Sequence, residues 1–100
     1  MFIHTVYFWL KAGSTDVQKK QLLTDCRELL AAIPTVRKLY VGVPAGTARG
    51  VVDNTYGVGL TVLFDDAAGH DAYQPHPLHD RFIERNKETW DRVMVYDVVE

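Results

Sequence analysis

The stretch "FIHTVYFWL", residues 2–10, decides the fold because it reads as a strand with two apolar faces. β-Branched and aromatic residues fill the stretch, and Lys11, Ala12 and Gly13 end it. Side chains alternate along a strand, so one face carries Phe2, His4, Val6, Phe8 and Leu10, and the other carries Ile3, Thr5, Tyr7 and Trp9. Because both faces are apolar, we expect both to be covered, one by helices of the same chain and the other by a second copy of the chain.

The clearest helix pattern follows, over residues 14–34. Thr15 and Gln18 have the spacing of a capping box, and Pro34 stops the run. Five residues form an apolar stripe at helical spacing: Leu22, Cys26, Leu29, Leu30 and Ile33. Because Cys26 falls within this stripe, it is expected to be a small buried core residue rather than a reactive thiol.

The remaining elements complete a recognisable order. Strands are predicted over 36–44, 56–64 and 91–99, with a long loop over 45–55 between the first two. A short helix is predicted over 65–74, and a longer one from Pro77 to Trp90. The order is βαββαβ, which predicts a ferredoxin-like α+β fold with a four-stranded antiparallel sheet, as a single domain over 1–100. The uncovered sheet face predicts a homodimer through the sheet faces, forming a dimeric α/β barrel.

Composition narrows the classes of partner. The 100 residues are 47% hydrophobic and 24% charged, with a formal net charge of -2, and no basic patch indicates a nucleic-acid partner. The apolar N-terminal run lacks the basic flank and cleavage site of a signal peptide, and no run reaches the roughly 20 residues of a membrane span. A single cysteine forms no internal disulfide. We therefore expect a soluble cytoplasmic protein without a membrane contact.

The stretch "YQPHPLHDRF", residues 73–82, carries the candidate chemistry. A histidine titrates near neutral pH, so His79 beside Tyr73 is a candidate acid–base pair. In the first turn of a helix beginning at Pro77, His79 meets the positive end of the helix dipole, which favours the neutral imidazole that a base requires. The alternative is structural: the same histidine bonds a backbone carbonyl and holds the turn.

The whole chain resembles the stress-responsive A/B barrel domain (Dabb) family. The resemblance is carried by His4 in "IHTVYFWLK", by the strand "VGLTVLFDD", and by the motif residues Tyr73, His76, Pro77, His79 and Phe82. It implies a dimeric α+β barrel. In one branch, the plant polyketide cyclases that make olivetolic acid, a His and a Tyr of this motif form the acid–base pair, which implies catalytic roles for His79 and Tyr73. A first-strand histidine lines the pocket of that branch, which implies that His4 belongs to the catalytic site with His79 and Tyr73.

The resemblance also implies a pocket for a small apolar or carbonyl-containing ligand. Its expected further lining is Cys26, Val6, Phe8, Phe82 and His76. A pocket tyrosine of the cyclase branch is replaced by Cys26, so shape and hydrogen bonding differ from that branch. Two functions stay open: an enzyme acting through enolisation of a carbonyl compound, and a non-enzymatic stress-protection or ligand-binding homodimer with structural histidines.

No cofactor is expected, because the glycines form no nucleotide-binding pattern. No metal is expected either. His76 and His79 lie three residues apart near Asp71 and Asp80, and no further ligand pattern supports them. His70 is predicted to be exposed on the short helix.

Overall fold

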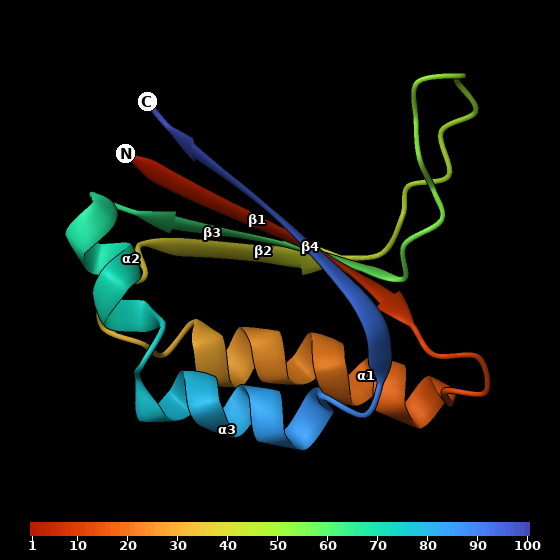
Figure 1. The fold of residues 1–100 in the computed structure, drawn as a ribbon, viewed down its shortest axis with the longest axis horizontal. Helices are drawn as coiled ribbons and strands as arrows, with labels where there is room; N and C mark the ends of the chain where they lie inside the picture. The colour runs from red at the N-terminus through yellow and green to blue at the C-terminus, as the bar shows by residue number, and fades with distance from the viewer.

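The computed structural model describes residues 1–100 as two layers, an antiparallel sheet and a layer of helices (Figure 1). The strands are β1 (Phe2–Leu10), β2 (Lys38–Gly42), β3 (Val58–Phe64) and β4 (Trp90–Val99), in the spatial order β2-β3-β1-β4. The helices are α1 (Asp16–Asp25), which continues as the π-helical segment η1 (Cys26–Leu30), α2 (Ala67–Tyr73) and α3 (Pro77–Asn86). This is the ferredoxin-like α+β fold that the sequence predicts.

The helices begin where the sequence predicts. Thr15 and Gln18 form the capping box of α1: the Gln18 amide donates to Thr15 Oγ1 over 3.1 Å, and the Thr15 amide donates to Gln18 Oε1 over 2.8 Å. Asp66 caps α2 by accepting from the Gly69 amide over 2.9 Å. These side chains satisfy backbone donors that have no partner within their helices.

The core lies between the helices and one face of the sheet, the inner face. Helices α1 and α3 lie side by side against this face (Figure 1). Their junction holds a buried carboxylate, Asp25, which accepts from Arg85 Nε over 2.7 Å and from Asn86 Nδ2 over 2.9 Å. The predicted apolar stripe faces the sheet, with four of its members buried: Leu22, Cys26, Leu30 and Ile33.

Strand β4 differs from its prediction at its start. The helix predicted from Pro77 to Trp90 ends at Asn86, and Trp90 is the first residue of β4. A register shift lies beside Trp9 and Leu10: Trp9 pairs with Arg92, and Leu10 pairs with Trp90. The extra residue, Asp91, is skipped, as in a β-bulge. Regular alternation would point Asp91 toward the helices, and the bulge points Trp90 there instead.

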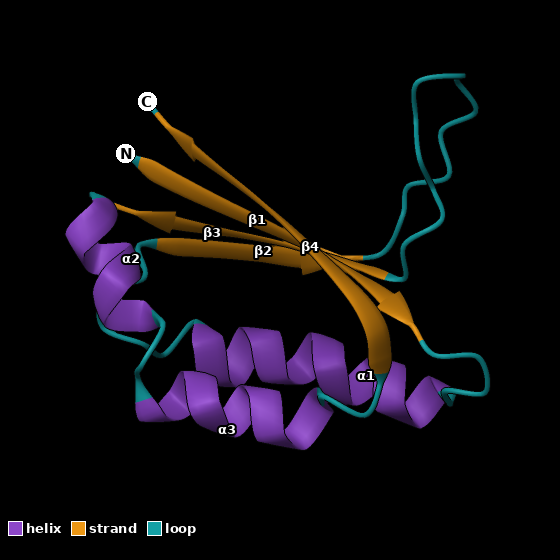
Figure 2. Cartoon of the chain, viewed as in Figure 1, coloured by secondary structure: helices purple, strands orange, loops and turns teal.

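Residues 43–57 form the long connection between β2 and β3, which projects beyond the sheet (Figure 2). Trp9 Nε1 donates to Thr55 Oγ1 over 2.9 Å and ties the base of this loop to β1. The loop is longer than predicted because β2 is two residues shorter at each end and β3 begins at Val58. No helix of the protein has the length and apolar character that crossing a membrane requires.

The outer face of the sheet has no helix over it. Tyr40 and Tyr96 are more than half exposed there, and Val98 is 56% exposed. Tyr7 lies between them on β1, with its ring centroid 6.3 Å from that of Tyr96. The first strand therefore does carry apolar side chains on both faces, as its sequence indicates.

Candidate functional site

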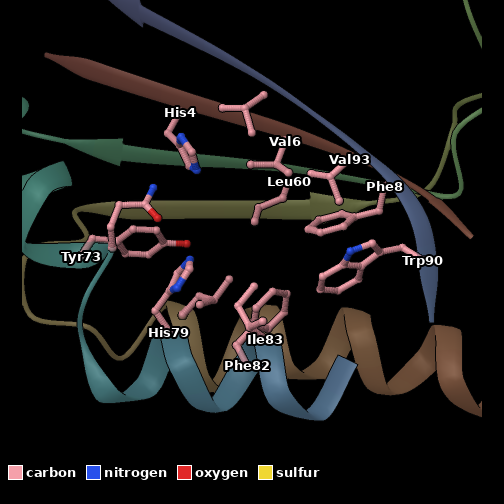
Figure 3. A pocket seen from close by; sticks show the side chains of 13 residues that line it. His4, Val6, Phe8, Leu60, Tyr73, His79, Phe82, Ile83, Trp90 and Val93 are labelled. Carbon is pink, nitrogen blue, oxygen red and sulfur yellow. The ribbon is translucent and has the colours of Figure 1, made fainter. Parts of the chain in front are cut away.

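A cavity of about 190 Å³ lies between the inner face of the sheet and α3 (Figure 3). Six of the predicted site residues line it: His4, Val6, Phe8, Tyr73, His79 and Phe82. Further lining comes from residues that were not predicted to bind a ligand: Leu30, Leu60, Gln74, Ile83, Trp90, Val93 and Val95. The fold thus brings together residues that lie up to 91 positions apart in the chain, from Val95 back to His4.

The cavity has a polar end and an apolar end. At the polar end the Tyr73 ring lies between two histidines, with ring centroids 4.9 Å from His79 and 5.9 Å from His4. At the apolar end the ring centroid of Phe8 lies 4.8 Å from that of Trp90, and the Phe82 ring stacks on Trp90 with centroids 6.1 Å apart. A ligand with an apolar body and one polar group fits this division.

Tyr73 presents a free hydroxyl to the cavity. The residue ends α2 and is 1% exposed, and its hydroxyl oxygen points into the cavity (Figure 3). Burial raises the pKa of Tyr73 well above its ordinary value, with a smaller contribution from Cys26, and no hydrogen bond opposes this shift. The hydroxyl is therefore protonated at neutral pH and is available as a hydrogen-bond donor to a ligand.

His79 stands in the first turn of α3, as predicted. Pro77 is the first residue of this helix, and His76 caps it by accepting from the Leu78 amide at Nδ1 over 3.1 Å. The pKa of His79 is lowered, first by burial and then by the nearby His4 and His70, while Asp80 opposes the shift. Burial therefore favours the neutral imidazole, whereas the sequence analysis attributed the neutral form to the helix dipole alone. The neutral imidazole forms no hydrogen bond with another residue, and it faces the cavity.

His4 is buried and paired with a residue that the sequence analysis missed. Its Nδ1 lies 2.6 Å from Oδ1 of Asp97, and the two residues face each other across β1 and β4. Burial lowers the pKa of His4, and the hydrogen bond and charge of Asp97 oppose that shift. The signal was present in "VMVYDVV" (93–99), where Asp97 is the one charged residue within an apolar strand.

His70 was predicted to be exposed, and the structure corrects this. Its ring stacks on Phe2 with centroids 4.4 Å apart and lies 4.9 Å from the His4 ring. The cause is the position of α2, which packs over the first residues of β1 and the last of β3. Candidate metal-ligand atoms of His4, His70 and Asp97 lie within 4.8 Å of one another. The sequence analysis considered only His76 and His79 with Asp71 and Asp80, and it did not identify this set.

Two predicted ligand-binding residues lie outside the cavity lining. Cys26 is fully buried in the first turn of η1, where burial raises the pKa of its thiol to about 12. The side chain of His76 is used to cap α3. The core role predicted for Cys26 and the turn role considered for His76 agree with these positions.

The arrangement defines a class of protein: a ferredoxin-like α+β domain with a side-chain-lined cavity between sheet and helices. The chain belongs to the stress-responsive A/B barrel domain family (Dabb), whose model matches residues 2–100. The family resemblance drawn from the motif around His79 is therefore confirmed. No curated protein matches the chain significantly.

Solved structures share the fold. A Dabb family protein with a ferredoxin-like fold from Mesorhizobium loti is 28% identical, with a TM-score of 0.79 over 99% of this chain and 95% of that chain. A dimeric ferredoxin-like protein of unknown function from Thermobifida fusca is 24% identical, with a TM-score of 0.84 over 99% and 90%. Hydroxynitrile lyase from Passiflora edulis is 16% identical, with a TM-score of 0.83 over 97% and 90%. The last two likenesses show the fold alone.

Proposed function

We propose that the cavity binds a small carbonyl compound with an apolar body and that His79 and Tyr73 catalyse its enolisation. The single observation that carries this proposal is that the His79 imidazole and the Tyr73 hydroxyl face the same cavity without hydrogen-bond partners in the protein. Burial lowers the pKa of His79 and raises that of Tyr73, which favours the neutral form of both groups. Catalytic acids and bases need their lone pairs and protons free for the substrate, whereas structural histidines are hydrogen-bonded.

In this reaction the imidazole of His79 takes a proton from the carbon next to the carbonyl group. The electron pair of the broken C–H bond forms the C=C bond of an enolate, and the carbonyl oxygen receives the charge. Tyr73 donates a hydrogen bond to that oxygen and stabilises it. The imidazolium then returns the proton, either to another carbon of the substrate or to an oxygen formed when the enolate attacks a second carbonyl group.

Two likenesses to other proteins and the size of the cavity support this class of reaction. Aldol ring closure of a poly-β-ketone, as in the resembling polyketide cyclases, proceeds through an enolate of this kind. The neighbour from Passiflora edulis is a hydroxynitrile lyase, so the fold is compatible with lyase chemistry. The cavity of about 190 Å³ is smaller than the roughly 300–1,000 Å³ of typical ligand pockets, which favours a small ligand.

The test is hydrogen–deuterium exchange at the carbon next to a carbonyl group. Acetophenone is incubated in heavy water with the full chain, and loss of the methyl proton signal is followed by NMR. We expect the protein to accelerate the exchange. His79→Gln should reduce the accelerated rate by about 100-fold or more, because it removes the base. Tyr73→Phe should also reduce it by about 100-fold, because it removes the donor to the enolate oxygen.

A matched control is His76→Asn, which removes a histidine outside the cavity and keeps a residue that caps helices well. It should exchange the ketone at the wild-type rate. Binding of the ketone without exchange would favour the non-enzymatic ligand-binding protein. Equal rates for wild type and His79→Gln, with His79→Gln less stable by about 1–3 kcal/mol, would make His79 a structural residue and overturn the proposal.

We also propose that the chain forms a homodimer through the outer face of its sheet. The support is the exposed outer-face side chains of Tyr40, Tyr96 and Val98, together with neighbours from Thermobifida fusca, Bacteroides fragilis and Jannaschia that are described as dimeric. Scattered single apolar residues are normal on the surface of a monomer, but these side chains share one face of the sheet. Pairing two such faces would remove their apolar surface from water.

Sedimentation of outer-face variants tests the dimer. Tyr96→Lys places a charge in the proposed interface and should weaken the dimer at least tenfold, about 1.4 kcal/mol. The matched control is Val17→Lys, since Val17 is 77% exposed on α1, away from the sheet. A wild-type chain that sediments as a monomer at micromolar concentration would contradict this part of the proposal.

A cytoplasmic setting is part of the same proposal. Its support is the buried free thiol of Cys26, which forms no disulfide and suits a reducing compartment. Fractionation of the source cells, with the protein found outside the cytoplasmic fraction, would contradict it.

A further inference from the structure

Three elements bring two imidazoles and a carboxylate together at the end of the sheet where both termini lie (Figure 1). His4 comes from β1, His70 from α2 and Asp97 from β4. One candidate ligand atom of each lies within 4.8 Å of the other two, and His4 Nδ1 lies 2.6 Å from Asp97 Oδ1. This cluster borders the polar end of the cavity, because His4 belongs to the cluster and also lines the cavity.

We propose that His4, His70 and Asp97 bind a divalent transition-metal ion of the Zn²⁺ type. Two imidazoles and one carboxylate are the ligand set of catalytic zinc sites and of two-histidine, one-carboxylate iron sites. Nitrogen ligands disfavour Mg²⁺ and Ca²⁺, which take oxygen ligands. A set of three protein ligands leaves at least one coordination position open to a ligand.

The distances require small movements only. Zn–N and Zn–O bonds of about 2.0–2.2 Å place neighbouring ligand atoms of a tetrahedral site about 3.3 Å apart. The 2.6 Å contact between His4 and Asp97 has to lengthen, and the widest separation, at most 4.8 Å, has to shorten. The side chain of Asp97 is 37% exposed and has room to rotate, while His4 is fixed by burial at 6% exposure.

The surroundings of His70 fit a metal ligand. Its Nε2 lies 2.9 Å from Gln74 Nε2, and its Nδ1 lies 3.7 Å from a carboxylate oxygen of Asp71. Because the Gln74 amide nitrogen can only donate, Nε2 is the His70 nitrogen with the free electron pair, and an ion bound there would take the place of the Gln74 contact. The Nδ1–H group would then be on the side of the Asp71 carboxylate, an acceptor of the kind that metal-bound histidines normally have. Stacking on Phe2 fixes the plane of the ring. A hydrogen bond between His4 and Asp97 alone would not require His70 to be there.

The test is metal binding by the full chain, freed of any histidine tag and treated with a chelator. Zn²⁺ binding is measured by calorimetry, and Co²⁺ binding by its visible absorption bands. We expect one ion per chain with a dissociation constant in the micromolar range or below. His70→Phe keeps the stacking and Asp97→Asn keeps an acceptor for His4, yet each removes a ligand and should weaken binding by about 100-fold. His76→Asn, which removes a histidine outside the cluster, should bind like wild type.

The readout is binding rather than turnover, so this proposal stands or falls separately from the enolisation proposal, which uses His79 and Tyr73. Unfolding in the presence of chelator confirms that each variant is folded. The proposal is overturned if the wild type binds no Zn²⁺ above its surface background. It is equally overturned if His70→Phe and Asp97→Asn bind as the wild type does, or if His76→Asn weakens binding as much as they do.

Discussion

Strands β3 and β4 both flank β1, and both point valines toward the helices, yet the two sets of valines differ in burial. On β3, Val58 and Val62 are fully buried. On β4, Val93 and Val95 are 39% and 44% exposed. The difference lies in the helix layer, in which α2 and η1 contact β1, β2 and β3, whereas β4 makes its main contacts with β1.

This comparison separates the fully covered part of the inner face, on β3, from the β4 side of the candidate site, which is partly exposed. The cavity is lined on its β4 side by Val93 and Val95, the two lining residues of this strand whose side chains are partly exposed. Asp97 also lies on β4, facing His4. Val93 and Val95 of β4 have exposed apolar surface that a ligand can cover, whereas Val58 and Val62 of β3 have none.

The largest expected effect comes from placing the same charge on each strand. Val62→Asp buries a carboxylate without a partner and should cost about 4 kcal/mol or more, a large part of the stability of a small domain. Val95→Asp places the carboxylate beside water and should cost less than about 1 kcal/mol. Urea denaturation followed by circular dichroism measures both. Similar losses for the two variants would mean that β4 is covered as fully as β3.

A second way to break the comparison is to loosen the helix layer. Asp25→Ala removes the carboxylate that joins α1 to α3 and leaves the buried Asn86 Nδ2 with one acceptor, the Phe82 carbonyl, instead of two, at a cost of about 1–3 kcal/mol. Amide hydrogen exchange should then rise on β3 more than on β4. The control is Glu28→Ala, at an exposed position just after Asp25, which should leave both strands protected. Unchanged exchange on β3 would show that the α1–α3 junction does not maintain its cover.

The sequence predicted most of the fold because local signals were strong. The capping box at Thr15 and the helix start at Pro77 each depend on neighbouring residues alone, and each was found where predicted. The helix end predicted at Pro34 was placed too late, because the helical segment ends at Leu30. The start of β4 was predicted less well. The bulge beside Leu10 depends on how two distant strands pair, and no pattern within residues 86–91 specifies it.

The candidate site could be predicted only in part, for a related reason. Tyr73 and His79 lie in one motif, and both were found at the cavity. Asp97 lies 93 positions from His4, so their contact depends on strand order and register. His70 was assigned to the surface because helix periodicity alone does not show which face of α2 meets the sheet.

A third prediction sharpens the role of the β4 side as the partly exposed side of the cavity. Val95→Trp adds bulk at this edge and should weaken binding of acetophenone about tenfold, or about 1.4 kcal/mol, because it fills space that the ligand needs. Stability should change little, since the side chain is 44% exposed. Chemical-shift titration measures the affinity. Val98→Trp, on the outer face of the same strand, is the control and should bind the ketone like wild type.

The smallest expected effect is on the pH dependence of stability. It depends on how the pKa of the buried His79 differs from the pKa of the same group in the unfolded chain. Its pKa is lowered from 6.5 in the folded protein, chiefly by burial, so the unfolded chain takes up this proton at a higher pH. The unfolded state then binds more protons, and the free energy of unfolding falls as the pH falls through about 6.5 toward the lowered folded pKa.

His79→Gln removes this contribution, so its free energy of unfolding should fall less steeply than that of the wild type as the pH is lowered from 7.5. Urea denaturation at several pH values measures the slope, and an NMR titration of the ring locates the folded pKa directly. Parallel slopes, together with a ring that titrates at or above 6.5, would mean that His79 is as accessible to water as a residue on the open side of the sheet. The polar end of the cavity would then belong with the uncovered β4 side, and His79 would lack the burial that favours its neutral form.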